Sequence, residues 1–234
     1  MNAAALTRTL RVIVIGALLV AGCTRSAPHG TGVYLLLDTS GTYRQELDKA
    51  AQIINYTLTR LGPYDSFAVA SINTGSFTEK NIIAKVTLDD RPSTANAQKR
   101  AFSDSIAKFL KTEHASAYTD ITGGLLQAVE FLNEKGPGRK AIFIFSDMKE
   151  DLQKGYVRDI PVPLEGFEVV ALNVTKLRSD NLDPREYLGR LEQWREKVEN
   201  GRGTWRVIND LDRLEGLLGG GVVLASEPSR GTRE

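Results

Sequence analysis

Short apolar segments alternate with helical patterns along most of the chain, and this alternation limits the possible folds more than any other feature. Val33–Leu37 is an unbroken apolar run, which is typical of a strand buried on both faces. Leu47, Ile54 and Leu58 then recur at helical spacing, until Gly62 and Pro63 end the pattern. Repeated strand–helix alternation predicts a parallel sheet with helices on both of its faces.

The same patterns predict the remaining elements. The expected strands are Ser66–Ile72, Ile82–Leu88, Ala141–Ser146, Phe167–Val174 and Thr204–Ile208, and the expected helices are Ala95–Leu110, Ile121–Asn133, Pro184–Val198 and Leu211–Leu218. The polar turn Asn73–Ser76 is too short for a crossover connection, so one of the two strands it joins should be antiparallel to the rest. The predicted class is α/β: a Rossmann-like open sheet, mostly parallel with one antiparallel edge strand.

The N-terminus has the pattern of a secretory signal peptide. Arg8 and Arg11 precede the apolar run 12–20, and small residues follow up to Cys23. That run is shorter than the roughly 20 residues that span a bilayer. Cys23 is the only cysteine in the chain, so no internal disulfide is expected. Its position after Ala21 and Gly22 resembles the lipobox of bacterial lipoproteins.

The lipobox resemblance implies acylation of Cys23 and anchoring in a bacterial cell envelope. Thr24 stands where an aspartate would favour retention in the inner membrane, so the outer membrane is the expected location. The expected organisation is a signal peptide at 1–22, the lipidated cysteine and a tether at 23–31, one domain at 32–218 and a disordered tail at 219–234.

The charge pattern argues against nucleic acid as a partner. The formal net charge is +1 and the pI is about 7.8. The sequence contains no basic block and no interleaving of basic and aromatic residues, which are the usual marks of nucleic-acid binding.

Oxygen-bearing side chains stand at the ends of three predicted segments. Asp38, Ser40 and Thr42 follow the first strand, Thr119 precedes a helix, and Asp147 follows the strand that begins at Ala141. Ligands of open α/β sheets bind beyond the carboxyl ends of the parallel strands, where these residues should meet. Two carboxylates and three hydroxyls make an all-oxygen site that suits Mg²⁺, Mn²⁺ or Ca²⁺.

The element order and these residues resemble a von Willebrand factor A domain over residues 32–218. The family's metal-ion-dependent adhesion site begins Asp-x-Ser-x-Ser, matched by Asp38, Ser40 and Thr42, with a threonine replacing the second serine. Its separate threonine matches Thr119 and its distal aspartate matches Asp147. The resemblance implies that these side chains hold Mg²⁺, with Mn²⁺ or Ca²⁺ as substitutes, and that an Asp or Glu of a partner protein completes the coordination.

Three further residues are candidates for the rim of this site. Asp120 and Glu150, like the neighbouring Asp151, are interpreted as solvated or helix-capping carboxylates, or as groups with a role in metal affinity or in the choice of partner. Met148 follows Asp147 and is a candidate for an exposed partner contact. Ser40, Thr42 and Thr119 also have a purely structural interpretation, because serine and threonine are favoured at helix N-termini.

No enzyme is expected from these residues. A phosphatase of the haloacid dehalogenase type could use Asp38 as nucleophile and Asp147 as metal ligand, but Ser40 replaces the aspartate that serves as general acid/base. An aspartic protease needs a glycine where Ser40 stands and an all-β fold. His29 and His114, the only histidines, have no nucleophile near them in sequence. The principal alternative to recognition is a structural subunit of an envelope assembly whose metal only stabilises the fold.

Overall fold

The computed structural model describes residues 30–40, 46–72, 78–112, 116–177, 179–209 and 213–214. The predicted signal peptide, Cys23, the C-terminal tail and Thr42 lie outside these residues, as does most of the predicted helix Leu211–Leu218. None of the described helices is both long and apolar enough to cross a membrane.

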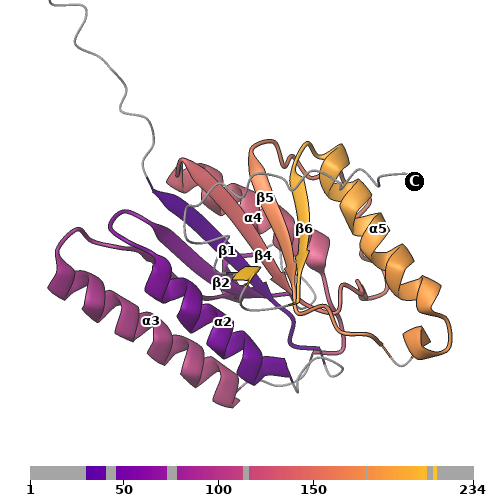
Figure 1. Ribbon diagram of the computed structural model, residues 1–234, viewed down its shortest axis with the longest axis horizontal. Coiled ribbons are helices and arrows are strands. Elements are labelled where there is room, and N and C mark those ends of the chain that lie inside the picture. The colour runs from indigo at the N-terminus through magenta and orange to yellow at the C-terminus, as the bar shows by residue number, and fades with distance from the viewer. Residues whose placement is uncertain are drawn as a thin grey trace, which may run out of the picture.

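Within the described residues, six strands form one sheet in the order β3-β2-β1-β4-β5-β6 (Figure 1). Their bounds are β1 (Thr31–Leu37), β2 (Ser66–Ser71), β3 (Ile82–Thr87), β4 (Arg139–Phe145), β5 (Phe167–Leu172) and β6 (Thr204–Ile208). All neighbouring strands are parallel except β2 and β3. The prediction of a mostly parallel sheet with one antiparallel edge strand is confirmed.

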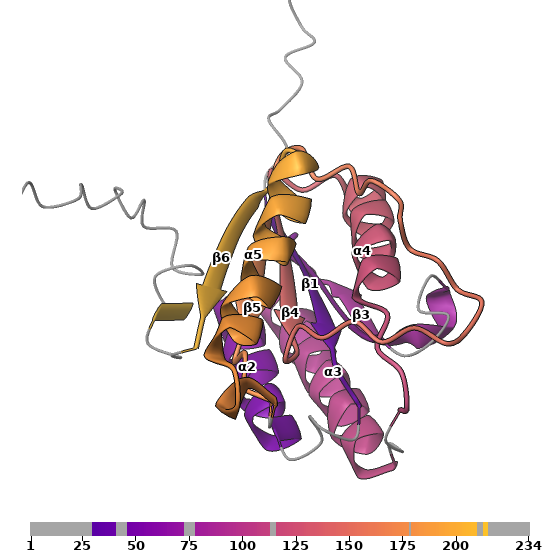
Figure 2. The same cartoon turned by 90° about the vertical axis from the view of Figure 1, so that its right-hand side faces the viewer.

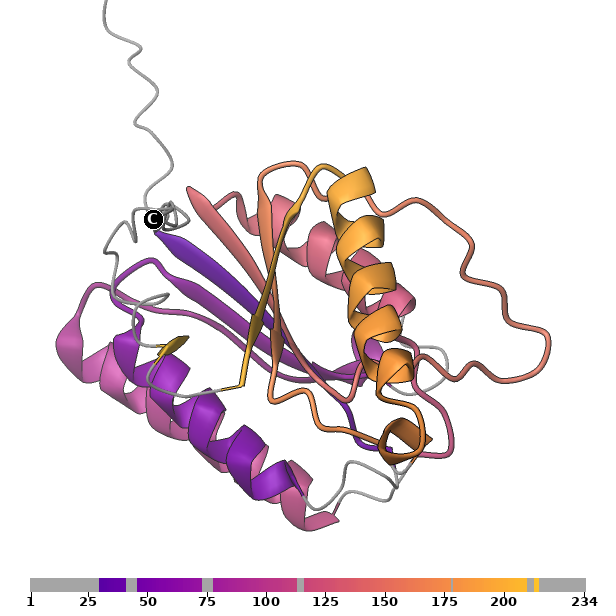
Figure 3. The same cartoon turned by 45° about the vertical axis from the view of Figure 1, so that its right-hand side comes forward.

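Helices cover both faces of the sheet (Figures 2 and 3). The helices are α2 (Leu47–Arg60), α3 (Pro92–Thr112), α4 (Ile121–Lys135) and α5 (Pro184–Asn200), with the short 3-10 turns η2 (Glu79–Asn81) and η3 (Ser179–Asn181). Figure 3 shows α2 and α3 together on one side of the sheet, and α4 and α5 on the other. Residues 146–166 connect β4 to β5 through irregular backbone that runs past α4.

The central strand β1 explains why the first apolar run is unbroken. Val33, Leu35 and Leu37 belong to the core beneath α2 and α3, whereas Tyr34 and Leu36 belong to the core beneath α4 and α5. Successive side chains of a strand point to opposite faces, so a strand covered on both faces has no polar positions. The strand itself begins at Thr31, two residues before the apolar run.

The register of β1 and β4 brings their carboxyl ends together. Leu37 pairs with Phe145, and the next residue continues the ladder because the Asp38 amide donates to the Phe145 carbonyl at 3.0 Å. Asp38 therefore lies beside Ser146 and Asp147 at the carboxyl end of the sheet. The segment before α4 also reaches the carboxyl end of the sheet. The Asp120 amide donates to the carbonyl of Ile72, the residue after β2, at 2.9 Å.

Candidate metal-ion site

Asp38 is a buried carboxylate held by three hydrogen bonds. It is 1% exposed. Its Oδ1 accepts from the Ser40 amide at 2.8 Å and from Thr119 Oγ1 at 3.5 Å, and its Oδ2 accepts from Ser146 Oγ at 2.6 Å. The structure thus joins three of the predicted site segments through one side chain. Ser146 is a contact that the sequence did not indicate.

The predicted residues Ser40, Thr119 and Asp147 line one cavity of about 330 Å³ at the carboxyl end of the sheet. The other lining residues are Ser116, Ala117, Lys149, Asp151 and Leu177. Backbone contacts between neighbouring loops form its walls: the Ser116 amide donates to the Thr39 carbonyl at 2.9 Å, and Thr119 and Asp151 exchange two hydrogen bonds of 2.7 and 2.9 Å. Asp38 lies directly behind this lining, through its contacts with Ser40 and Thr119.

Buried carboxylates elsewhere in the fold are neutralised by arginine. Asp120 pairs with Arg158 at 2.7 Å, and Asp180 pairs with Arg190 at 2.8 Å. No ion pair of the described residues includes Asp38. A buried ionised carboxylate is costly unless a cation or a metal compensates it. The buried position of Asp38 next to an open cavity, whose lining includes Ser40, Thr119 and Asp147, therefore fits a divalent cation.

The hydroxyls are essential to this fit. The described residues contain no group of three or more His, Cys, Asp or Glu side chains that could hold a metal by themselves. A site built on Asp38 and Asp147 would need further oxygen ligands, and the predicted ones are Ser40, Thr119 and, outside the described residues, Thr42. Mg²⁺ accepts such a mixture, because it commonly binds through one or two carboxylates and keeps several waters.

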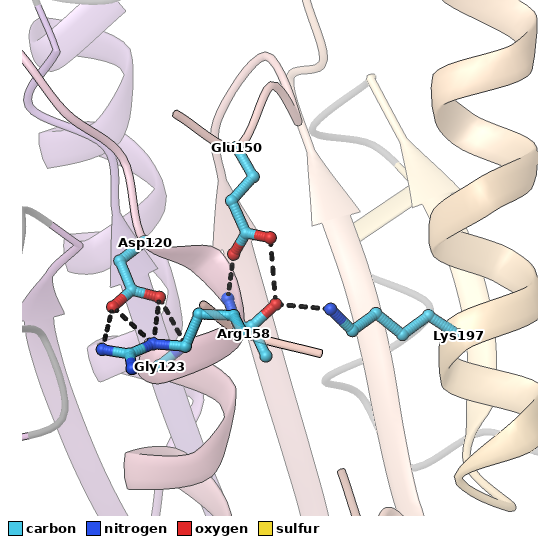
Figure 4. A network of polar contacts seen from close by, with 6 residues as sticks. Asp120, Gly123, Glu150, Arg158 and Lys197 are labelled. Carbon is cyan, nitrogen blue, oxygen red and sulfur yellow. Dashed lines mark hydrogen bonds and ion pairs between the residues drawn. The ribbon is translucent and has the colours of Figure 1, made fainter. Parts of the chain in front are cut away.

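Two of the predicted rim residues are helix-capping groups (Figure 4). Asp120 is the N-cap of α4, where its Oδ1 accepts from the Gly123 amide at 2.7 Å. Glu150 accepts from the Thr122 amide at 2.7 Å and from the Thr122 hydroxyl at 3.2 Å. These bonds satisfy amides that the first turn of a helix leaves unpaired. The capping interpretation of Asp120 and Glu150 agrees with this geometry.

Basic side chains complete the network around the start of α4. Figure 4 shows Arg158 and Glu150 approaching this end of the helix, with Lys197 reaching it from α5. Lys197 Nζ donates to the Thr122 hydroxyl at 2.6 Å. The hydrogen bond to Asp120 raises the pKa of the Arg158 guanidinium above its usual value, so this arginine stays charged. The network fixes the helix end that immediately follows Thr119.

The prediction that Met148 is an exposed partner contact is wrong. Its side chain is 0% exposed and packs in the core beneath α4 and α5. The backbone at Met148 has a φ of 65°, which lies in the left-handed region. Sequence reasoning assumed that a residue next to a surface ligand is itself exposed, and a left-handed backbone position breaks that assumption.

The arginines of the site were also missed. Arg158 lies 38 residues from its partner Asp120, and Arg190 lies 10 residues from Asp180. Nothing in their local sequence separates them from the other basic residues of the chain. Their partners are buried aspartates, and a buried aspartate implies a compensating cation, but this burial is visible only in the structure.

Comparisons with protein-family models and with curated proteins found no match. Solved structures are similar in fold. The pilus adhesin SpaC of Lactobacillus rhamnosus GG, in its open conformation, matches with a TM-score of 0.51 and 14% identity over 84% of this chain and 30% of that chain. A von Willebrand factor type A protein from Catenulispora acidiphila gives a TM-score of 0.51 and 14% identity over 82% of this chain and 42% of that one.

The minor pilin PilB of Streptococcus sanguinis has a TM-score of 0.51 and 10% identity over 83% of this chain and 60% of its own. The chain thus spans between 30% and 60% of the length of these three structures. At such low identity the likeness concerns the fold. The sheet order, the helices on both faces and these matches together show that the chain has the fold of a von Willebrand factor A domain.

Proposed function

We propose that this protein is a recognition module that binds a partner protein through a divalent cation. The observation that carries the proposal is the open cavity lined by Ser40, Thr119 and Asp147, with the buried carboxylate of Asp38 behind it. Thr42 is assigned to the same site from its place in the sequence motif. The pilus adhesin and the minor pilin among the similar structures support a role in protein–protein contact.

Each residue of the proposed site has a distinct task. The hydroxyls of Ser40, Thr42 and Thr119 offer neutral oxygens, and Asp38 and Asp147 supply the negative charge. A bound Mg²⁺, or Mn²⁺ or Ca²⁺ in its place, supplies an open coordination position for an Asp or Glu of the partner. The cavity gives that carboxylate access, and the hydrogen bonds to Asp38 hold its oxygens in place. The protein performs no chemistry of its own in this proposal.

The proposed location is the bacterial cell envelope, with the domain tethered to a membrane through lipid on Cys23. The sequence pattern around Cys23 is the main support, and the resemblance of the fold to a pilus adhesin and a minor pilin agrees with it. Thr24 favours the outer membrane. Metabolic labelling with a fatty acid tests the anchor: wild type should carry the label and Cys23→Ser should not.

The decisive experiment is a pull-down from solubilised envelope, with residues 30–234 as bait. Wild type would be used in Mg²⁺ and in EDTA, and Asp38→Asn in Mg²⁺. Asp151→Asn is the matched control, because Asp151 lines the same cavity but lies outside the motif. We expect a partner retained by wild type and by Asp151→Asn in Mg²⁺ only. Equal retention by Asp38→Asn, or in EDTA, would refute cation-bridged recognition.

Thermal unfolding, read together with the pull-down, separates this function from a purely structural metal. A cation that binds only the folded state stabilises it by about 2.7 kcal/mol at a hundredfold excess over its Kd. We expect Mg²⁺ to raise the melting temperature of wild type and not of Asp38→Asn. If Mg²⁺ stabilises wild type while the partner is retained in EDTA, the site is structural, as in the alternative of an envelope subunit.

A further inference from the structure

Two side chains of α5 donate hydrogen bonds to consecutive backbone carbonyls at the proposed metal site. Arg190 Nε donates to the Asp147 carbonyl at 3.0 Å, and Trp194 Nε1 donates to the Met148 carbonyl at 2.8 Å. Residues four apart lie on the same face of a helix, so one face of α5 makes both contacts. α5 comes from a part of the chain about 40 residues further on, and it contributes no ligand.

The turn that contains these two carbonyls includes a residue in an unfavourable backbone conformation. Met148 occupies a left-handed conformation with a φ of 65°, which is unfavourable for a residue with a side chain. Within the turn, the Met148 amide donates to Ser146 Oγ at 3.0 Å and the Lys149 amide donates to Asp147 Oδ1 at 2.9 Å. The direction of the Asp147 carboxylate therefore depends on the conformation of the turn that α5 holds.

Arg190 is itself fixed by a buried aspartate. Its Nη1 and Nη2 donate to the two carboxylate oxygens of Asp180 at 3.1 and 2.8 Å. Asp180 Oδ2 also accepts from the Leu177 amide at 2.7 Å, and Leu177 lines the same cavity as Asp147. The Asp180–Arg190 pair thus joins two walls of the cavity, one from the segment after β4 and one from the segment after β5.

We infer that Arg190 is a positioning residue that orients Asp147 for the divalent cation. The inference rests on the proposed metal site. The Nε of Arg190 binds the backbone carbonyl of Asp147, and its other two nitrogens bind Asp180, so the guanidinium sets the backbone from which the Asp147 carboxylate projects. Only the planar fork of arginine reaches all three oxygens at once, whereas lysine is a single point charge.

The test compares Arg190→Lys with Arg139→Lys in the domain of residues 30–234. Arg139 also pairs with a carboxylate, Glu168, at 2.7 Å, but at the opposite end of β4. Calorimetric titration with Mn²⁺ alone should show binding weakened about tenfold or more in Arg190→Lys, the usual range for residues that support metal ligands. Arg139→Lys should match wild type. Amide exchange of Lys149, measured by NMR in EDTA, should be faster only in Arg190→Lys.

Trp194→Phe is the second variant, for the case in which Arg190→Lys does not fold. It keeps an aromatic ring in the core, although a smaller one, and removes the donor to the Met148 carbonyl, so Lys149 exchange should again rise and Mn²⁺ binding should fall. Wild-type affinity and wild-type exchange in the folded variants would overturn the positioning role and leave the metal site standing. If wild type itself binds no Mn²⁺, the metal site is refuted and the positioning role falls with it.

Discussion

Each buried aspartate of this fold must recover the hydration energy that its carboxylate loses on burial. Asp120 does so through Arg158 and the first turn of α4, and Asp180 does so through Arg190 and the Leu177 amide. The hydrogen bond from Arg190 holds the pKa of Asp180 below its usual value, although burial acts in the opposite direction. The charged form of Asp180 is therefore part of the folded state.

This lowered pKa predicts a loss of stability in acid. Because the folded-state pKa of Asp180 is below its unfolded value of 3.8, its stabilisation is complete above that value and disappears as the pH falls through the folded-state pKa. Urea unfolding of wild type and Asp180→Asn should differ by roughly 3 kcal/mol near pH 6, the cost of breaking a buried pair. The difference should shrink below about pH 4. A difference that is independent of pH would contradict this role.

At the scale of elements, the N-terminal end of α4, which follows Thr119, packs closely against the sheet. Gly124 lies in its first turns, and a Cβ added there would approach Ile72 Cγ2 to 2.8 Å and Leu36 Cδ2 to 3.0 Å. Both neighbours are buried. The glycine allows the helix to approach β1 and β2. This close packing keeps Thr119 near Asp38 at the carboxyl end of the sheet.

Two glycine-to-alanine changes should therefore have opposite effects. Gly124→Ala gains about 1 kcal/mol of helix propensity but overpacks the core, which costs about 1–3 kcal/mol, so it should destabilise the protein. Gly189 in α5 is exposed, with nothing within 4 Å of an added Cβ, so Gly189→Ala should stabilise by up to about 1 kcal/mol. Chemical denaturation of both variants measures the signs. Stabilisation by Gly124→Ala would show that α4 has room to move.

At the scale of the whole molecule, one sheet separates two hydrophobic cores. Ile54 lies in the core beneath α2 and α3, and Leu125 lies in the core beneath α4 and α5. Both are fully buried. The central strands β1 and β4 contribute alternate side chains to each core, so neither layer of helices can detach without exposing the other face of the same strands.

This arrangement predicts a single cooperative unfolding transition. Both tryptophans, Trp194 and Trp205, pack on the α4–α5 side, so their fluorescence reports directly on that core. Ile54→Ala, in the opposite core, should nevertheless lower the fluorescence midpoint as much as the far-ultraviolet circular dichroism midpoint. The expected loss is about 2–5 kcal/mol, as for Leu125→Ala. Separate midpoints for the two probes in Ile54→Ala would show that the layers unfold independently.

The elements of the sheet were predictable because their signals are local. Each described strand and helix lies within a few residues of its predicted bounds; α3 begins at Pro92 rather than Ala95, because proline is well suited to the first helical position. The shared location of the site residues was also predictable, because parallel strands place their carboxyl ends together. These residues are Asp38, Thr119 and Asp147. Whether these side chains hold a cation stays a prediction.

The sequence by itself determined the period of burial along each segment and the chain positions of the oxygen side chains, because both follow from neighbouring residues. Only the tertiary structure decided which charges meet: Arg158 with Asp120, and Arg190 with Asp180 and the Asp147 carbonyl. It also placed the Met148 side chain in the core, at a residue with a left-handed backbone angle. These contacts join residues far apart in the chain, and their energies depend on burial and geometry that exist only once the sheet and helices have packed.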